Sequence, residues 1–410
     1  MDLTLPQGHV ELRERVRAFV EREVRPKATE REKRRDPLAR FPWDIVEAAA
    51  AEGLLTLTLR TEHGGGGADE LAQALVLEEL SAGDMGIAQV LRAQFVYTEL
   101  FNVVATDAQR ARFLPELLEN PRCVLAGAMT EPETGSDHSL PYDGVEGGPH
   151  TTAVREGDRY RLNGRKTLIT SGGVARYYFI WARTDPSVAP RQGTSWFLVP
   201  HDTPGLRVGH VYDKLGQRLA TNAELIFEDC VIPAGNRFGA HDGAASLGIH
   251  SNPALGAAQA IGVARGAYEA ALARARWRVQ GGRPIIEHPQ VAALLAEMAI
   301  GLEAARTLVW RSCTTPDPGG MVSLLGMMAK VHATEMAAEV TRRAIQVFGG
   351  YGVTEEYPVE KFFRDAATLF HPAAATNQVM LQKIAARLPD DETLSPHLRA
   401  ASCRYVGEPA

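Results

Sequence analysis

The chain has 410 residues, 45% of them hydrophobic, and a formal net charge of -6 at pH 7. A chain of this size and composition can bury large cores, so it predicts a folded protein of two or three domains and excludes a largely disordered one. Basic and acidic residues are interspersed along the whole sequence, which leaves no basic surface to recommend nucleic acid as a partner.

The cysteines are far apart and have no CxxC spacing, at positions Cys123, Cys230, Cys313 and Cys403. This spacing argues against a structural zinc site and against a dense disulfide framework, so no metal is expected. The N-terminal residues contain no basic segment followed by an apolar core, and no stretch approaches the roughly twenty apolar residues of a membrane span. We therefore expect a soluble, untargeted protein in the reducing cytoplasm.

The first part of the chain, from Val10 to about Arg122, has a helical pattern. Apolar residues recur three and four positions apart, as in Val16, Phe19 and Val20. Four successive glycines, 64–67, interrupt the pattern and predict a loop or a close approach between helices. They are a weak match to a phosphate-binding loop, because no Lys-Ser/Thr follows them.

The pattern changes after Val124. Alternating apolar residues lie on both sides of Asn163-Gly164, which predicts a hairpin with a type I′ turn. Two further short runs, Ser195–Val199 and Glu224–Phe227, are β-branched or aromatic and predict strands. The Pro- and Gly-rich segment Leu140–Pro149 predicts a surface loop within this β region.

Helical periodicity returns beyond Phe238. One apolar stripe has the spacing of a helix face and consists of Val291, Leu294, Leu295, Met298, Leu302, Ala305 and Leu308. The order of helices, strands and helices excludes the alternating βαβ pattern of a doubly wound fold. We expect a mostly α fold with a central β domain. Its predicted parts are an all-α domain at 1–125, a β domain at 126–237, a helical bundle at 238–390 and a tail at 391–410.

Two segments are dense in residues that can carry chemistry. Ala128–Asp137 brings hydroxyls, backbone amides and a glycine to the start of the β region, where they either grip a cofactor or form a capped turn. The second segment, Gln346–Gly352, has three glycines in four positions after a helical run. Such glycines either let the backbone approach a ligand or only end the helix.

Together these segments, about two hundred residues apart, resemble both signatures of the acyl-CoA dehydrogenase family. The resemblance covers nearly the whole chain and includes further matches at Glu62–Gly65, Leu162–Thr170, Leu215–Arg218, Phe227–Asp229 and Arg278–His288. It implies a helical N-terminal domain, a middle β-barrel domain, a C-terminal four-helix bundle, bound FAD and a homotetramer or homodimer. It also implies an acyl-CoA or acyl-carrier-protein thioester as substrate, and an electron-transfer flavoprotein or another acceptor as redox partner.

The resemblance implies roles for individual residues only where they match the family pattern. The positions that match contacts to the flavin and its pyrophosphate are Met129, Thr130, Ser136 and Thr170, and Thr376 and Gln378 match the cofactor-contacting Thr-x-Gln. Thr170 matches a threonine that bonds near flavin N5. The positions that match contacts to the adenosine half, usually of the neighbouring subunit's FAD, are Arg278, Gln346, Gly349 and Gly350. The chain departs from the pattern at Thr134 and at Leu168, where relatives commonly stack an aromatic residue on the flavin.

The largest departure concerns the catalytic base. Desaturation of an acyl thioester removes an α-proton while hydride leaves the β-carbon for flavin N5, so a proton acceptor must lie across the substrate from the ring. The usual glutamate of the family aligns with Ala373 or Ala374, and the second family site aligns near Ser251, which Asn252 follows.

Three other residues are candidate bases. His371 and His250 each lie beside one family site, and an imidazole can accept a proton at physiological pH. A histidine before proline is, however, more often a packing or turn residue. Glu99 lies on the helix that lines the acyl pocket in the family, together with Arg92, Gln94 and Tyr97, although an ordinary exposed helix carboxylate is the more common explanation for such a residue.

Three functions therefore stay open. The leading one is an FAD-dependent dehydrogenase of an acyl thioester with a displaced base. The second is a flavoenzyme of the same fold with other chemistry, such as an enoyl-thioester reductase, a desulfinase or a flavin monooxygenase. The third is a flavin-binding paralogue without turnover.

Overall fold

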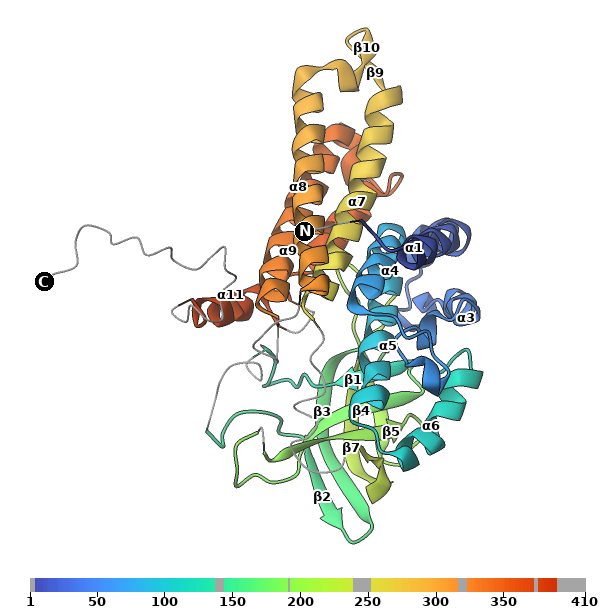
Figure 1. The fold of residues 1–410 in the computed structure, drawn as a ribbon, viewed down its shortest axis with the longest axis vertical. Coiled ribbons are helices and arrows are strands. Elements are labelled where there is room, and N and C mark those ends of the chain that lie inside the picture. Colours follow the sequence, from blue (N-terminus) through green and yellow to red (C-terminus); the bar gives the residue numbers. More distant parts are fainter. Residues whose placement is uncertain are drawn as a thin grey trace, which may run out of the picture.

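The computed structural model describes residues 4–136, 144–190, 192–238, 252–315, 323–371 and 375–388. A helical region comes first, a sheet follows it, and long helices form the last part (Figure 1). The predicted fold class, mostly α with a central β domain, is confirmed. The exact domain boundaries stay predictions.

The N-terminal region is helical, as its periodicity predicts. Its helices are α1 (Gln7–Phe19), the π-helical turn η1 (Val20–Val24), α2 (Arg25–Glu32), α3 (Trp43–Ala51), α4 (Glu70–Gly83), α5 (Met85–Val103) and α6 (Asp107–Glu119), with 3₁₀ turns η2 (Leu38–Arg40), η3 (Leu54–Thr56) and η4 (Thr61–His63). Side chains define where the longer helices begin, because Asp69 and Asp84 accept bonds from Ala72 N and Ile87 N at the starts of α4 and α5. The glycine cluster forms the predicted loop after η4.

The middle region is a sheet. Its strands are β1 (Leu125–Ala128), β2 (Thr152–Glu156), β3 (Arg159–Thr170), β4 (Tyr177–Arg183), β5 (Thr194–Pro200), β6 (Leu206–Val211), β7 (Asn222–Pro233) and β8 (Arg237–Phe238), with the turn η6 (Ala234–Asn236). The strand order is β6-β7-β3-β2-β4-β5-β8, and β1 pairs with β4 in parallel. Both short strand predictions are confirmed, since they fall within β5 and β7.

The prediction of a hairpin turn at Asn163-Gly164 is wrong. β3 runs straight through both residues, and the chain reverses instead at Gly157, between β2 and β3. Gly164 has φ +144° and marks a shift in the pairing of β3 with β7. A Cβ there would lie 2.6 Å from the Cα of Thr151. The glycine therefore lies opposite a β-bulge of β7 and permits a close backbone approach, which the Asn-Gly pair alone does not distinguish from a turn.

The C-terminal region packs three long helices against one another. Its elements are α7 (Ala254–Trp277), β9 (Val279–Gln280), β10 (Arg283–Pro284), η8 (Ile285–Glu287), α8 (Pro289–Thr314), α9 (Leu324–Phe348), η9 (Gly349–Val353), α10 (Val359–Ala367) and α11 (Asn377–Ala385). The predicted apolar stripe lies in α8, where Leu295, Met298, Leu302 and Ala305 are buried. α10 packs on α7 and α9, and α11 packs on α9.

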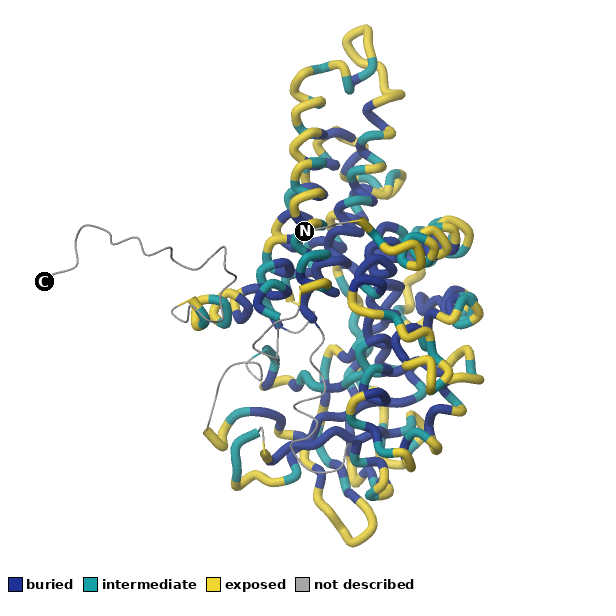
Figure 2. The backbone as a smooth tube through the Cα atoms, viewed as in Figure 1, coloured by how far each residue is buried: buried dark blue, intermediate teal, exposed yellow. Residues whose placement is uncertain are grey.

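Burial is highest where α4, α5 and the sheet-proximal halves of the long helices meet (Figure 2). The outer end of the bundle, with β9 and β10, is largely exposed (Figure 2). Across the described ranges, no helix has both the length and the apolarity needed to span a bilayer. Cys123, Cys230 and Cys313 are free thiols. Within the same ranges, no group of His, Cys, Asp or Glu is arranged to hold a metal ion.

Candidate functional site

The first predicted cofactor segment lies against the end of β3. Thr167 N donates a hydrogen bond to Thr130 O at 2.9 Å, and Lys166 Nζ donates to Met129 O at 3.1 Å. The main chain at Met129 and Thr130 is thus held next to the strand that carries Thr170. Met129, Thr130 and Thr170 are all partly exposed, so they are accessible to a ligand.

A buried ion pair between Lys166 of β3 and Glu131 holds this segment against the strand. Lys166 Nζ lies 2.7 Å from Glu131 Oε1, and both side chains are almost fully buried. Burial alone would raise the pKa of Glu131, but Lys166 and the hydrogen bonds from Thr151 lower it below its ordinary value. Burial lowers the pKa of Lys166 to about 8, although Glu131 opposes the shift. Glu131 also accepts from His150 N, so the pair ties together the two ends of the loop that contains residues 144–149.

The predicted Thr-x-Gln segment meets the same site from the helical region. Thr376 N donates to Ser136 Oγ at 3.3 Å, across 240 residues of sequence. Thr376 also starts α11, because its side chain accepts from Val379 N. Gln378, on the first turn of α11, is exposed. The structure therefore brings Ser136 and Thr376 together as the sequence predicts.

The end of β3 has an unusual backbone. Leu168 and Ser171 have φ values of +56° and +60°, in the left-handed region that side chains other than glycine rarely adopt. Thr170 lies between them and pairs with Asn222 of β7. The Leu168 side chain is 51% exposed. Strained backbone of this kind clusters at ligand sites, where the surrounding structure holds it.

The second predicted set lies at the outer end of the bundle. Arg278 follows α7, and Gln346, Gly349 and Gly350 lie where α9 ends (Figure 1). The side chain of Arg274 joins these elements, since its guanidinium lies over the rings of Trp277, Phe348, Tyr351 and Tyr357 at 4.9–5.1 Å. Arg278 and the glycine turn are thus grouped together, at the opposite end of the bundle from the sheet.

The candidate bases differ in their surroundings. His371 is exposed and directly follows Phe370, while His250, Ser251, Ala373 and Ala374 lie outside the described residues. Glu99 is half-buried, and burial raises its pKa, although a 2.7 Å hydrogen bond from Asn102 opposes the shift.

Comparison with known proteins decides the family. Three domain families match in order: acyl-CoA dehydrogenase N-terminal domain at 6–121, middle domain at 126–230 and C-terminal domain at 246–388. The chain belongs to the acyl-CoA dehydrogenase family. It is 35% identical over 372 residues to a short-chain specific acyl-CoA dehydrogenase of Clostridium acetobutylicum, covering 89% of this chain and 94% of that one. It is 37% identical over 372 residues to a cyclohex-1-ene-1-carbonyl-CoA dehydrogenase of Syntrophus aciditrophicus, covering 90% and 86%.

A solved structure agrees with this assignment. Butyryl-CoA dehydrogenase of Megasphaera elsdenii superposes with a TM-score of 0.85 at 31% identity, over 95% of this chain and all of that one. As a member of this family, the present chain is an oxidoreductase, and FAD is its cofactor.

The residues at the end of β3 fit such a cofactor. Partly exposed hydroxyl-bearing residues of the two predicted segments meet there, Thr130 and Ser136 from the first and Thr376 from the second. Leu168 of β3 adds an exposed apolar side chain. Two buried hydroxyl oxygens flank Thr170, Ser171 Oγ and Thr221 Oγ1, and neither has a hydrogen-bond partner among the described residues. Polar groups that contact phosphate and ring heteroatoms, set beside an apolar face, are what a flavin requires.

Sequence reasoning missed several residues that hold the site. Lys330 of α9 is fully buried and donates to Phe370 O at 3.3 Å, Ala375 O at 2.9 Å and Asn377 Oδ1 at 2.7 Å. It thereby fixes the chain on both sides of the alanine segment. Burial, together with the charge of Arg92, lowers the pKa of Lys330 to about 8. A lysine on a helix gives no local signal for such bonds.

A carboxyl group near the second family base site was also missed. Asn252 Nδ2 donates to Glu70 Oε2 at 2.7 Å, and burial raises the pKa of Glu70. Glu70 begins α4, where the sequence marks it only as an acidic residue in a first helical turn. It joins Glu99 as a carboxyl group of the N-terminal region whose pKa is raised, although Glu70 is more exposed than Glu99.

An ion cluster joins all three regions of this family member. Lys361 of α10 lies 2.8 Å from Asp84 and 2.6 Å from Asp365, and the side chains of all three are buried. Asp365 also accepts from Gln217 N of the sheet region at 2.6 Å. We call Asp84, Lys361 and Asp365 the interdomain ion cluster.

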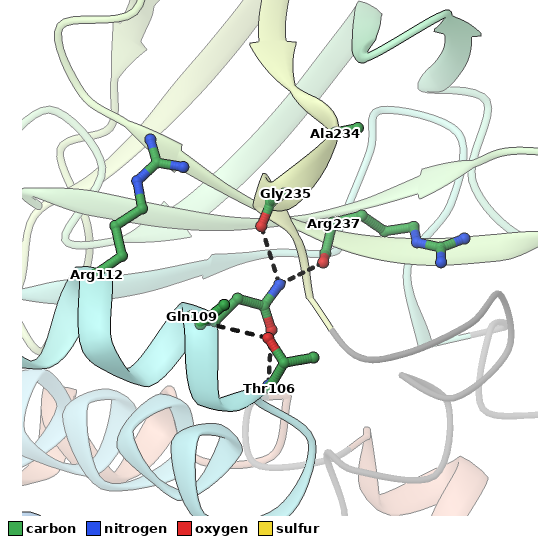
Figure 3. A pocket seen from close by; sticks show the side chains of 7 residues that line it. Thr106, Gln109, Arg112, Ala234, Gly235 and Arg237 are labelled. Carbon is green, nitrogen blue, oxygen red and sulfur yellow. Dashed lines mark hydrogen bonds between the residues drawn. The ribbon is translucent and has the colours of Figure 1, made fainter.

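A separate cavity of about 290 Å³ lies between α6 and η6 (Figure 3). It is lined by Thr106, Ala108, Gln109, Arg112, Ala234, Gly235 and Arg237. Gln109 closes one side, since its amide donates to the main-chain oxygens of Gly235 and Arg237 (Figure 3). None of the predicted site residues lines it, so it is distinct from the candidate flavin site.

Proposed function

We propose that this acyl-CoA dehydrogenase family member desaturates an acyl thioester between Cα and Cβ, with a proton acceptor that does not come from position 373 or 374. The observation that carries the proposal is the bond from Thr376 N to Ser136 Oγ, which joins the two predicted flavin segments in one site. FAD, when bound, accepts the hydride that leaves the β-carbon. The protein's part is to hold the thioester across the ring and to accept the α-proton.

Within one subunit, we propose that Met129, Thr130, Ser136, Thr170, Thr376 and Gln378 hold the flavin. The contacts around Thr130, Thr167 and Ser136 support this assignment. Arg278, Gln346, Gly349 and Gly350 are grouped at the other end of the bundle, which supports their assignment to the FAD of a neighbouring subunit. A homodimer or homotetramer follows, and light scattering tests it, because a monomer would contradict this assignment.

The base is proposed among His371, His250, Glu99 and Glu70. The half-buried Glu99 and the more exposed Glu70 both have raised pKa values, which bring a carboxylate closer to the range where general bases act. Replacement of the true base should lower the rate of flavin reduction about 10²–10⁴-fold. His371→Ala, His250→Ala, Glu99→Gln and Glu70→Gln are the variants to compare, and Glu303→Gln, on the exposed face of α8, is a matched control.

The test is anaerobic mixing of the yellow protein with a panel of saturated acyl thioesters, on CoA and on carrier protein. A desaturase must bleach the oxidised flavin without oxygen and release a product lighter by two hydrogens. Failure of every saturated thioester to bleach the flavin would refute the proposal. Reoxidation by an electron-transfer flavoprotein, compared with oxygen, then identifies the acceptor. The free thiols Cys123 and Cys230 support a cytoplasmic location.

A second candidate function is a flavoenzyme of other chemistry, such as an enoyl-thioester reductase, a desulfinase or a monooxygenase. The residue at the usual base position, Ala373 or Ala374, and Ser251 at the second position favour it, because neither position carries a carboxylate. It predicts no bleaching by the saturated chains. It predicts turnover instead with an added sulfinated chain or, once a chemical reductant has reduced the flavin, with an enoyl thioester or oxygen. A protein that binds the flavin but converts none of these compounds instead indicates a non-catalytic paralogue.

A further inference from the structure

Asn222 connects the strained end of β3 to a lysine of the sheet region. Its amide Nδ2 donates to Leu168 O at 2.6 Å, and its Oδ1 accepts from Lys214 Nζ at 2.7 Å. Chemistry fixes this orientation of the amide, because an ammonium group only donates and a carbonyl oxygen only accepts. Lys214 and Leu168 therefore hold the two ends of one amide.

This amide bridge acts at the point where β3 leaves regular pairing. Lys166 pairs with Leu225 and Ile169 with Ala223, so β3 has one residue more than β7 between these pairs. Leu168 takes up the extra residue with its φ of +56°. A leucine in this conformation costs about 1–2 kcal/mol, so contacts must hold it there. The bond from Asn222 to the Leu168 carbonyl is such a contact.

The bulge determines where Thr170 points. Thr170 and Asn222 are direct partners across the two strands, so their side chains project from the same face of the sheet. Removal of the extra residue would shift the register by one and turn Thr170 to the opposite face. The contact that holds Leu168 thus also determines the direction of the Thr170 hydroxyl.

We infer that Lys214, acting through Asn222, is a positioning residue of the flavin site that fixes the bulge at Leu168 and so presents Thr170. This inference rests on the proposed contact between Thr170 and the flavin. Lys214 is not placed among the residues that touch substrate. Its role is to hold the Asn222 amide, and the charge on its ammonium group strengthens that bond.

Lys214 also makes the bridge sensitive to pH. Burial lowers the pKa of Lys214 to about 7, although the charges of Asp365 and Asp84 oppose the shift. Asp365 and Asp84 also form ion pairs with Lys361. Arg218, four residues after Lys214, donates from its Nε to the main-chain oxygen of Lys214. A neutral amine is a weaker donor than an ammonium group. As pH rises through about 7, the bridge weakens and the end of β3 becomes less firmly held.

The test uses two readouts on the same variants. The first is hydrogen exchange of the peptide that spans residues 167–172 in flavin-free protein, corrected for the intrinsic pH dependence of exchange. The second is the dissociation constant of FAD between pH 6 and 8.5. The variants are Lys214→Met, which removes the donor, Lys214→Gln, which keeps an uncharged donor, and Asn222→Ala. Lys33→Met, an exposed lysine paired with Glu30, is the control.

In wild-type protein, exchange at 167–172 and the FAD dissociation constant should both rise with a midpoint near pH 7. Lys214→Met and Asn222→Ala should raise the dissociation constant roughly fivefold at pH 6 and abolish the midpoint. Lys214→Gln should also lack the midpoint but should restore slow exchange. The control should behave as wild type.

The inference is overturned if Lys214→Met leaves both readouts unchanged, or if Asn222→Ala alters them while Lys214→Met does not. Its failure is distinguishable from failure of the proposed function. A wild-type protein that binds no FAD refutes the function, yet the exchange measurement still shows whether Lys214 holds the end of β3.

Discussion

Lys361→Met should strongly destabilise the protein, because it leaves two buried carboxylates without their cation. The Lys361 Nζ lies 2.8 Å from Asp84 and 2.6 Å from Asp365, and Lys361, the most exposed member of the interdomain ion cluster, is 4% exposed. The substitution preserves most of the side-chain volume, so its effect reports the charge. Removal of one partner from a buried ion pair typically costs about 3–5 kcal/mol of unfolding free energy.

The same contacts determine the pH at which the stability of Lys361→Met should be measured. Burial alone would lower the pKa of Lys361, but Asp365 and Asp84 raise it above the ordinary value of 10.5. A raised pKa in the folded state means that the stabilisation is fully present below the pKa of the unfolded chain and is lost only as pH rises beyond it. Equilibrium urea unfolding at pH 7.5, followed by tryptophan fluorescence, therefore measures the full effect.

A second substitution tests whether unpaired charge is the cause. Asp365→Asn should cost less than Lys361→Met, because Lys361 keeps Asp84 as a partner. The double variant should be more stable than Lys361→Met alone, since it holds one buried charge fewer. Arg342→Met, at an exposed pair with Glu339, should cause no measurable change. A loss below about 1 kcal/mol for Lys361→Met, or strict additivity in the double variant, would refute the reasoning.

Three further predictions concern single positions. Gly164→Ala should cost about 2 kcal/mol or more, since its Cβ would meet the Thr151 backbone at a φ of +144°, whereas Gly235→Ala, with open space around it, should be neutral in the same urea assay. Leu168→Gly should raise the stability of the flavin-free protein by about 0.5–1 kcal/mol, because it relieves the positive φ, and a lower melting temperature would contradict this. Between about pH 8 and 10.5, Lys330 has lost a proton in the folded state that it still binds in the unfolded chain, so the free energy of unfolding should rise with pH. Lys330→Met should remove this contribution to the slope of unfolding free energy against pH. An unchanged slope would exclude Lys330 as its source.

Periodicity in the sequence was enough to predict the order of helical, sheet and helical regions. The stripe from Val291 to Leu308 identifies the buried face of α8, because a helix with one apolar stripe turns that stripe toward the core and its polar side toward solvent. The Asn163-Gly164 pair misled because glycine permits the same positive φ in a turn and in a bulge. What separates the two is Thr151, whose approach no local pattern reveals.

The candidate site was predictable where residues match a family pattern, as at Ser136 and Thr376. Its supports were not predictable, because each depends on groups distant in sequence. Lys214 needs Asn222 and the bulge at Leu168, and Lys361 needs Asp84 from another region. A lysine that is buried in the fold reads like a surface lysine in the sequence.

Two of the three bonds from Lys330 end on the main-chain oxygens of Phe370 and Ala375, which every amino acid carries, and the third ends on the Asn377 side chain. An exchange of side chains at positions 373 and 374 leaves both acceptors in place. Loss of a carboxylate there is therefore separable, in evolution, from loss of the fold. Because these main-chain contacts do not depend on the side chains at 373 and 374, an acidic residue can be introduced there. Ala373→Glu and Ala374→Glu would then restore a carboxylate at the usual family base position within the same fold.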